Sequence, residues 1–174
     1  MSGKIGYCCQ ENLCDSDATV KDQLALYACI SGVSRKYVEE EADRFIKIFE
    51  LEDYRDTKCG LLSFGNKRKL NIAMAFIGNN ELVILDDPLA GVDPLSHKTL
   101  QKSILSVSKN KAVIISTQDP SVATALSTKS AILHKGHIVR FGSLDKIIEE
   151  AGGAGIFVAC YYDMPKLHAI DQDY

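Results

Sequence analysis

Two adjacent acidic residues, Asp86 and Asp87, directly follow the apolar run Leu82–Leu85. A short apolar run of this kind predicts a buried strand, and in open parallel sheets ligands bind beyond the carboxyl ends of the strands. Acids in that place can reach a Mg²⁺ ion and an attacking water. Taken alone, the pair is explained equally well as a solvated turn. Only the neighbouring motifs can distinguish a turn from a functional site.

Other polar residues follow the same apolar segments in a definite order. Asp93 and Pro94 stand shortly after the acidic pair, and a later apolar strand ends in the run 116–119, which contains Gln118. Upstream, the segment Leu62–Leu70 reads LSFGNKRKL and opens a predicted helix with a serine and a glycine. Free backbone N–H groups and the positive end of the helix dipole make such a start an anion site.

In this order, the motifs resemble those of the ATP-binding cassette family, and their sequences are most similar to those of subfamily A, the lipid-transporter-like branch. Gln10 resembles the glutamine of the Q-loop, Leu62–Leu70 the signature motif, and 82–87 the Walker B strand with its neighbouring catalytic carboxylate. Gly91–Pro94 resembles the D-loop, and 117–118 the switch loop. The resemblance extends over about residues 5–160.

The resemblance implies a role for each matched residue. Asp87 and Gln118 are implied as catalytic, and Gln10 and Asp86 as ligands of Mg²⁺. The residues implied to contact ATP are Gln10, Ser63, Gly65, Asp86 and Asp93. The implied cofactors are therefore ATP and Mg²⁺.

Departures from the family's pattern gather around the phosphates of the nucleotide. No segment matches G-x-x-x-x-G-K-[ST], the loop that cradles them, so the chain is not expected to bind ATP in a site of its own. Asp87 replaces the usual glutamate and is one methylene shorter, which predicts slow or absent hydrolysis. Gln118 replaces a histidine and cannot carry its positive charge, while Phe64 replaces the first glycine of the signature motif. ATPase activity is therefore left open.

Hydrophobic periodicity predicts helices that alternate with short strands. The first helix places Val20, Leu24, Tyr27 and Ile30 on one stripe. The predicted helices cover about 20–30, 34–49, 66–78, 96–107, a segment after residue 120, and 144–149; the predicted strands cover 5–8, 82–85, 112–116, 130–133, 137–140 and 156–161. This alternation indicates an α/β fold around a parallel sheet that is covered on both faces.

With the resemblance added, the fold expected is a partial P-loop NTPase (RecA-like) parallel-sheet core with an inserted helical subdomain. Residues 1–16 would hold the Q-loop strand of the core, and 17–78 the helical subdomain with the signature motif. Residues 79–151 would form the rest of the core, with Walker B, D-loop and switch loop. Residues 152–174 would be a linker with a C-terminal strand and tail.

Composition excludes several other classes of protein. The chain has 174 residues, 46% of them apolar, as expected of one globular domain. A net charge of −3 without a basic stripe argues against a nucleic-acid partner. Six cysteines without paired spacing predict reduced, mostly buried thiols, and no apolar stretch approaches the roughly 20 residues of a membrane span.

Three hypotheses of function follow. The first is a cassette fragment of an ABC transporter that couples ATP binding and hydrolysis to transmembrane transport, with lipid implied by the subfamily. It would lie at the cytoplasmic face of a membrane, with a second nucleotide-binding domain and a transmembrane domain as partners. The second is an inactive cassette that serves as a binding or regulatory module. The third is a truncated gene product, because loss of the strand and helix beside the phosphate loop would expose a strand edge and apolar surface.

Overall fold

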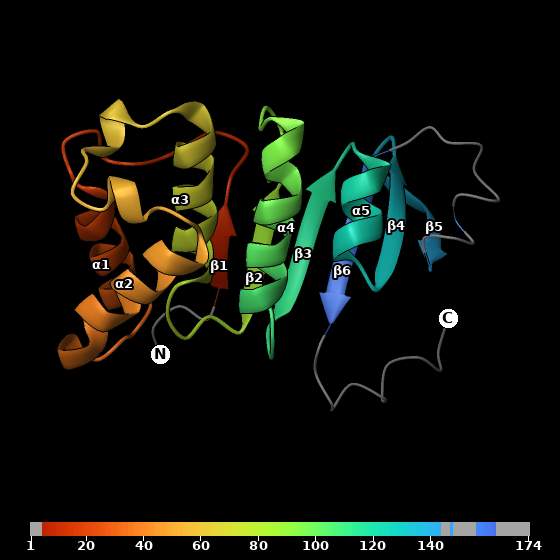
Figure 1. Ribbon diagram of the computed structural model, residues 1–174. Helices are drawn as coiled ribbons and strands as arrows, with labels where there is room; N and C mark the ends of the chain where they lie inside the picture. The colour runs from red at the N-terminus through yellow and green to blue at the C-terminus, as the bar shows by residue number, and fades with distance from the viewer. Residues whose placement is uncertain (1–4, 144–146, 148–155, 163–174) are drawn as a thin grey trace.

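The computed structural model describes residues 5–143, residue 147 and residues 156–162 (Figure 1). In this part of the chain, six strands form one sheet in the order β1-β2-β3-β6-β4-β5. The strands are β1 (Ile5–Cys8), β2 (Leu82–Asp86), β3 (Ala112–Thr117), β4 (Lys129–His134), β5 (His137–Gly142) and β6 (Ile156–Tyr162). β1, β2 and β3 are parallel and in register, with Asp86 beside Ser116. The polar residues that end β2 and β3 therefore meet at one edge.

The other half of the sheet is antiparallel. β6 lies between β3 and β4 and runs antiparallel to both, and β4 pairs with β5 as the predicted hairpin. Lys135 and Gly136 make its turn with φ of 47° and 80°. The prediction of a parallel sheet is thus confirmed for β1 to β3, and the outer edge of β3 is not exposed, because β6 pairs with it.

The predicted helices are present with small changes at their starts. α3 begins at Phe64 and α4 at Pro94, two residues earlier than predicted, because Ser63 and Asp93 cap them. α2 begins at Val38, after a 3₁₀ turn. The helices are α1 (Val20–Ile30), α2 (Val38–Ile48), α3 (Phe64–Phe76), α4 (Pro94–Val107) and α5 (Pro120–Leu126), with 3₁₀ turns η1 (Arg35–Tyr37), η2 (Glu52–Tyr54) and η3 (Cys59–Leu61).

Helices α1 and α2 lie beyond the β1 end of the sheet and pack beside α3 (Figure 1). Thr19 caps α1 through a reciprocal pair of hydrogen bonds with Asp22, the capping box. The predicted apolar stripe of α1 is wrong for Ile30, because this side chain is 61% exposed at the end of the helix. The expectation of mostly buried cysteines is also wrong: of the five described, all free, only Cys8 and Cys59 are buried.

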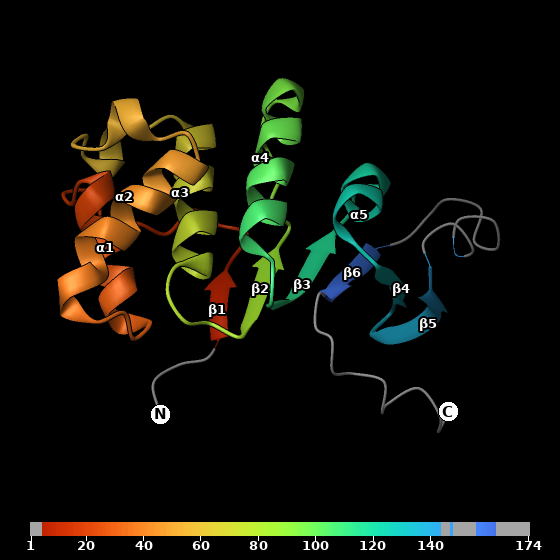
Figure 2. The same ribbon diagram turned by 60° about the horizontal axis from the view of Figure 1, so that its bottom comes forward.

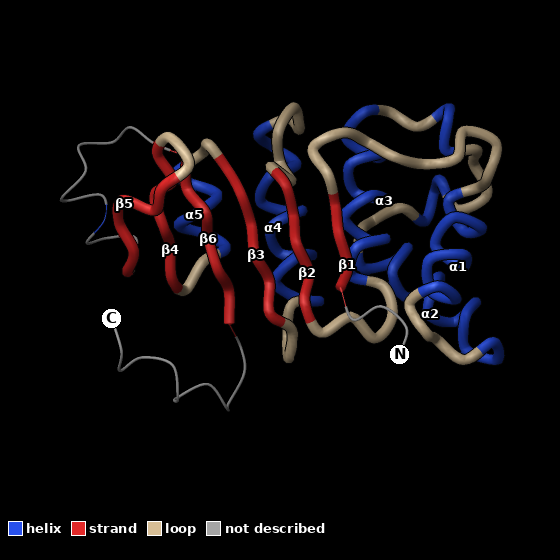
Figure 3. Tube along the Cα trace, turned by 180° about the vertical axis from the view of Figure 1, so that it is seen from behind, coloured by secondary structure: helices blue, strands red, loops and turns tan. Residues whose placement is uncertain are grey.

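In the described part of the chain, the helices that cover the sheet lie on one of its faces. α3, α4 and α5 lie in front of the strands in Figure 1, and Figure 3 shows the strands from behind with no described helix over them. Figure 2, turned by 60°, shows the same one-sided layering. Along β2, Val83 and Leu85 are buried against the helices, whereas Leu82 and Ile84 stay half-buried. The prediction of a sheet covered on both faces is therefore wrong for the described residues.

Two predicted segments cannot be compared with the structure. Of the helix predicted over 144–149 only residue 147 is described, and the predicted linker at 152–155 lies outside the described residues. Within the described part, no helix combines the length and apolar character needed to cross a membrane.

Candidate nucleotide site

The acidic pair lies at the carboxyl end of β2, where β3 holds it. The backbone N–H of Asp87 donates to the carbonyl of Ser116 at 3.0 Å and to its Oγ at 3.1 Å. The Ser116 hydroxyl donates to Oδ1 of Asp86 at 2.5 Å. Asp87 has a φ of 43°, in the left-handed region that Asp tolerates better than most residues. The protein's own hydrogen bonds therefore fix both acids to the end of β3.

The surroundings of Asp87 favour its neutral form. Burial raises the pKa of the Asp87 carboxyl, and the nearby charge of Asp86 adds to this effect. The positive charge of Arg68 opposes the rise without cancelling it. Asp119 differs, because a hydrogen bond from the Ser121 hydroxyl lowers the pKa of its carboxyl. The end of β2 and the start of α5 thus hold carboxyl groups whose pKa values are shifted in opposite directions.

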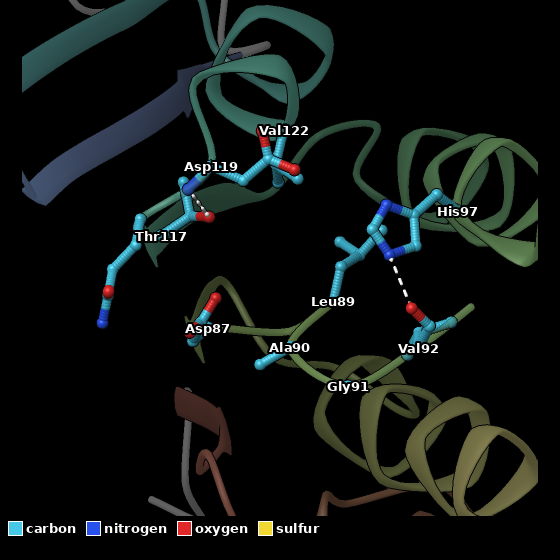
Figure 4. A pocket seen from close by; sticks show the side chains of 10 residues that line it. Asp87, Leu89, Ala90, Gly91, Val92, His97, Thr117, Asp119 and Val122 are labelled. Carbon is cyan, nitrogen blue, oxygen red and sulfur yellow. Dashed lines mark hydrogen bonds between the residues drawn. The ribbon is translucent and has the colours of Figure 1, made fainter. Parts of the chain in front are cut away.

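A pocket of about 360 Å³ opens beside residues 86–88, here called the acidic turn (Figure 4). Its walls come from the loop 89–92, the end of β3 and the first turns of α4 and α5. Asp87 and Gln118, both predicted as catalytic, line it together with Asp119 and His97. The structure therefore brings the two predicted residues to one pocket, and their catalytic role stays a prediction.

His97 is a pocket residue that the sequence did not single out. Its Nε2 lies 3.0 Å from the carbonyl oxygen of Val92, and since a carbonyl only accepts, this nitrogen carries the proton (Figure 4). The positive form of His97 also helps to lower the pKa of Asp119. The sequence gives only a weak signal for this residue, a single histidine in the first turn of a helix.

The start of α3 is open to solvent. Oγ of Ser63 accepts a hydrogen bond from the backbone N–H of Asn66 at 3.3 Å, as an N-cap does. A Cβ added at Gly65 would meet nothing within 4 Å. The ring of Phe64 lies against the loop at Gly91. A Cβ added at Gly91 would lie 2.8 Å from Cε1 of Phe64. Phe64 therefore joins the signature segment to the D-loop segment and leaves Gly65 uncovered.

The remaining predicted residues have other partners in the structure. Asp93 caps α4, with Oδ1 accepting from the backbone N–H groups of Leu95 and Ser96 at 3.1 and 3.0 Å. Gln10 is exposed, and its backbone carbonyl oxygen accepts a hydrogen bond from Nη1 of the buried Arg68 at 3.0 Å. The nucleotide roles predicted for Asp93 and Gln10 stay predictions.

Arg68 belongs to the segment that resembles the signature motif, but the sequence pattern did not predict a functional role for it. Its sequence signal is its spacing, because Arg68 stands four residues before the buried Ile72 on the helix face that packs inward. Its guanidinium lies directly under the acidic turn, where it donates to the carbonyl oxygens of Asp86, Asp87 and Pro88. A charged residue on the inward face of a helix thus indicates a buried hydrogen-bonding role.

The residues present supply only part of a Mg²⁺–ATP site. Asp86 offers a carboxylate, but among the described residues no three acidic, histidine or cysteine side chains gather as a metal site. The sequence contains no phosphate-binding loop. These residues do not fit a complete nucleotide site, so no hydrolysis step follows for this chain alone.

Comparison with known proteins decides the family. The model of the family described as ABC transporter matches residues 1–90, about half of the chain. The chain belongs to the ABC transporter family. A solved structure described as the ATP-binding subunit of an ABC transporter superposes on this cassette with a TM-score of 0.73 and 27% identity, covering 87% of this chain and 65% of the other. The predicted P-loop NTPase core is thereby confirmed.

Among characterised proteins, the cassette is similar to members of subfamily A. It is 34% identical over 152 residues to the human glucosylceramide transporter ABCA12, covering 87% of this chain and 6% of that protein. It is 35% identical over 163 residues to the human retinal-specific phospholipid-transporting ATPase ABCA4, covering 93% of this chain and 7% of that protein. The chain thus spans less than a tenth of these two relatives, and the predicted subfamily resemblance is confirmed.

Proposed function

We propose that this chain is a cassette segment that couples ATP binding to transmembrane transport by completing a nucleotide site on a partner. In the proposed complex, a second nucleotide-binding domain holds the phosphates of ATP. This chain presents the start of α3 to them, with Ser63 and Gly65 as the contacting residues. A transmembrane domain is the other partner, which would place the chain at the cytoplasmic face of a membrane.

The observation that carries the proposal is the open start of α3. Ser63 and Gly65 stand beside backbone N–H groups that have no helical acceptor, and no acidic residue occupies the first turn. Lys67, in the same turn, adds positive charge, and its Nζ donates to the carbonyl of Gly60 at 3.2 Å. Because Phe64 rests against Gly91, its ring does not close the approach to Gly65. An anionic phosphate group is the ligand that this geometry favours.

The absence of a phosphate-binding loop supports a site shared with a partner over a site of the chain's own. Asp87 in place of glutamate and Gln118 in place of histidine add to the same argument, since both weaken hydrolysis. The same two replacements favour the second candidate, a regulatory cassette that binds a partner without raising its turnover. Lipid as the cargo rests on the names of the subfamily A relatives.

Complementation in a mixed complex tests the proposal. The chain is mixed with a nucleotide-binding domain that has an intact phosphate loop but an arginine in place of its own signature serine, and ATP turnover is measured. We expect turnover to rise on mixing, and Ser63→Arg to abolish the rise. Ser34→Arg is the matched control, because Ser34 precedes a helical turn in the same subdomain without making a side-chain cap.

Two measurements on the isolated chain complete the test. Labelled ATP should not be retained, and Asp87→Glu alone should produce no ATPase activity, because the phosphate loop is still missing. Retention of ATP or measurable turnover would contradict the proposal. Binding of the partner domain with unchanged turnover would favour the regulatory candidate instead.

A further inference from the structure

Arg68 is the largest fully buried side chain among the described residues. A guanidinium has five N–H donors, and in this structure each hydrogen bond it makes goes to a backbone carbonyl. Nε donates to Pro88 at 2.8 Å, Nη1 to Cys9 and Gln10 at 2.7 and 3.0 Å, and Nη2 to Asp86 and Asp87 at 2.8 Å each. Every donor of the group is therefore used.

The five carbonyls come from two segments that are far apart in sequence. Cys9 and Gln10 follow β1, at the start of the predicted Q-loop, whereas the segment 86–88 forms the acidic turn after β2. Arg68 itself stands in the first half of α3, five residues after Ser63. One side chain thus joins three parts of the candidate site.

Burying a charge is costly unless hydrogen bonds replace the lost water. Here the carbonyl dipoles of the two segments supply that compensation. The dependence is mutual, because removing Arg68 would take a hydrogen-bond donor away from all five carbonyls, among them that of the buried Pro88. Lysine cannot substitute fully, since an ammonium group has three donors and no planar fork.

We infer that Arg68 is the positioning residue that holds the Cys9–Gln10 segment and the acidic turn 86–88 in one fixed relation to the start of α3. A displacement of either segment then moves the other, together with Ser63. The inference rests on the proposed function only in assuming that these segments act on a nucleotide. The hydrogen bonds that Arg68 makes to them are a property of the isolated chain and are measured there.

Asn71 provides a matched control on the same helix. It is 4% exposed, and its Oδ1 accepts from the backbone N–H of Leu13 at 2.8 Å, while its Nδ2 donates to the carbonyl of Lys67. Asn71 therefore holds the loop after β1 but has no hydrogen bond to the acidic turn. Replacing it should loosen one side of the site, whereas replacing Arg68 should loosen both.

Amide hydrogen exchange, followed by NMR on the isolated chain, tests this difference. In Arg68→Lys and Arg68→Gln we expect the amides of Leu13 and Asp87 to exchange at least about tenfold faster, by similar factors, while the amide of Leu24 in α1 keeps its rate. In Asn71→Ala only Leu13 should accelerate. Acceleration of one segment alone in the Arg68 variants, or equal acceleration of Leu24, would overturn the inference.

If ATP turnover does not rise in the mixed complex but the exchange rates change as expected, the proposed function is rejected and the inference is not.

The wild-type protein supplies a test that does not depend on whether a variant folds. If all five donors are bonded, the guanidinium protons of Arg68 give separate signals that exchange slowly with water. Rapid exchange of these protons with water would overturn the inference.

Discussion

Asp87 and Asp119 line the same pocket but respond oppositely to their surroundings. Burial raises the pKa of Asp87, which means that folding disfavours its charged form. The Ser121 hydroxyl lowers the pKa of Asp119, which means that folding favours its charged form. Above its raised pKa, Asp87 therefore costs stability, and the cost disappears as the pH falls through that value. Asp119 contributes stability above its ordinary pKa and loses it as the pH falls through the lowered value.

Asp87→Asn should consequently stabilise the chain at pH 7. Asparagine keeps the hydrogen-bonding shape and tolerates the positive φ, but carries no charge to desolvate. We expect the melting temperature to rise by less than about 4 °C, the shift that about 1 kcal/mol produces in a chain of this size. Thermal unfolding between pH 3 and pH 8 measures the effect, which should vanish at the acid end.

Asp119→Asn is the opposing control and should lower the melting temperature slightly at pH 7. The loss should be small, because asparagine also caps helices well. A fall in stability for Asp87→Asn at pH 7 would show that the charged form of Asp87 is favoured by the fold after all.

Part of the candidate site could be predicted from local sequence. Asp86 and Asp87 end an apolar run, and Ser63 begins a helical pattern, so both features follow from neighbours in sequence. The partners of Arg68 could not be predicted in this way. The carbonyls around Arg68 belong to residues about 20 and nearly 60 positions away, and only the packed fold brings them together.

At the scale of elements, the approach of β1 to α3 depends on a glycine. A Cβ added at Gly6 would lie 1.8 Å from the carbonyl oxygen of Ala75, which is backbone and cannot turn aside. The strand that leads to Gln10 therefore packs against the signature helix only because this position has no side chain.

Gly6→Ala should destabilise the chain by about 3 kcal/mol or more, because either β1 or α3 must shift. Gly65→Ala is the contrast, since Gly65 is helical and open, and it should gain about 0.5 kcal/mol. Urea unfolding followed by circular dichroism measures both. Equal effects of the two substitutions would mean that β1 and α3 are not in close contact.

Element positions were predicted better than element partners. The six strands fall where apolar runs and turn residues indicated, and Ser63 and Asp93 explain why two helices begin early. The place of β6 was not predictable, because its register with β3 joins residues about 50 positions apart, such as Ala112 and Tyr162. Local patterns do not specify which strands become neighbours at such separations.

At the scale of the whole molecule, the most unusual feature is the face of the sheet that no described helix covers. Ile5 and Tyr7 on β1 are 59% and 57% exposed, and their register partners on β2, Leu82 and Ile84, are half-buried. Parallel strands are ordinarily covered on both faces, and apolar patches of this kind favour association.

Ile84→Ser should therefore be tolerated, at a cost of about 1 kcal/mol, and should reduce the binding of the dye ANS. Leu85→Ser, one residue further along β2 but buried on the helix face, should cost about 3 kcal/mol or more. Denaturant unfolding and ANS fluorescence separate the two cases. If Ile84→Ser unfolds the chain as readily as Leu85→Ser, then this face is covered in solution.

The position of β6 also has a consequence for how the chain folds during its synthesis. β3 and β4 leave the ribosome before β6, yet β6 is the strand that lies between them. Until residues 156–162 emerge, the facing edges of β3 and β4 have no partner and present unpaired backbone groups. Closing the sheet is thus a late step of high contact order, so we expect nascent chains that stop before residue 156 to be held by chaperones.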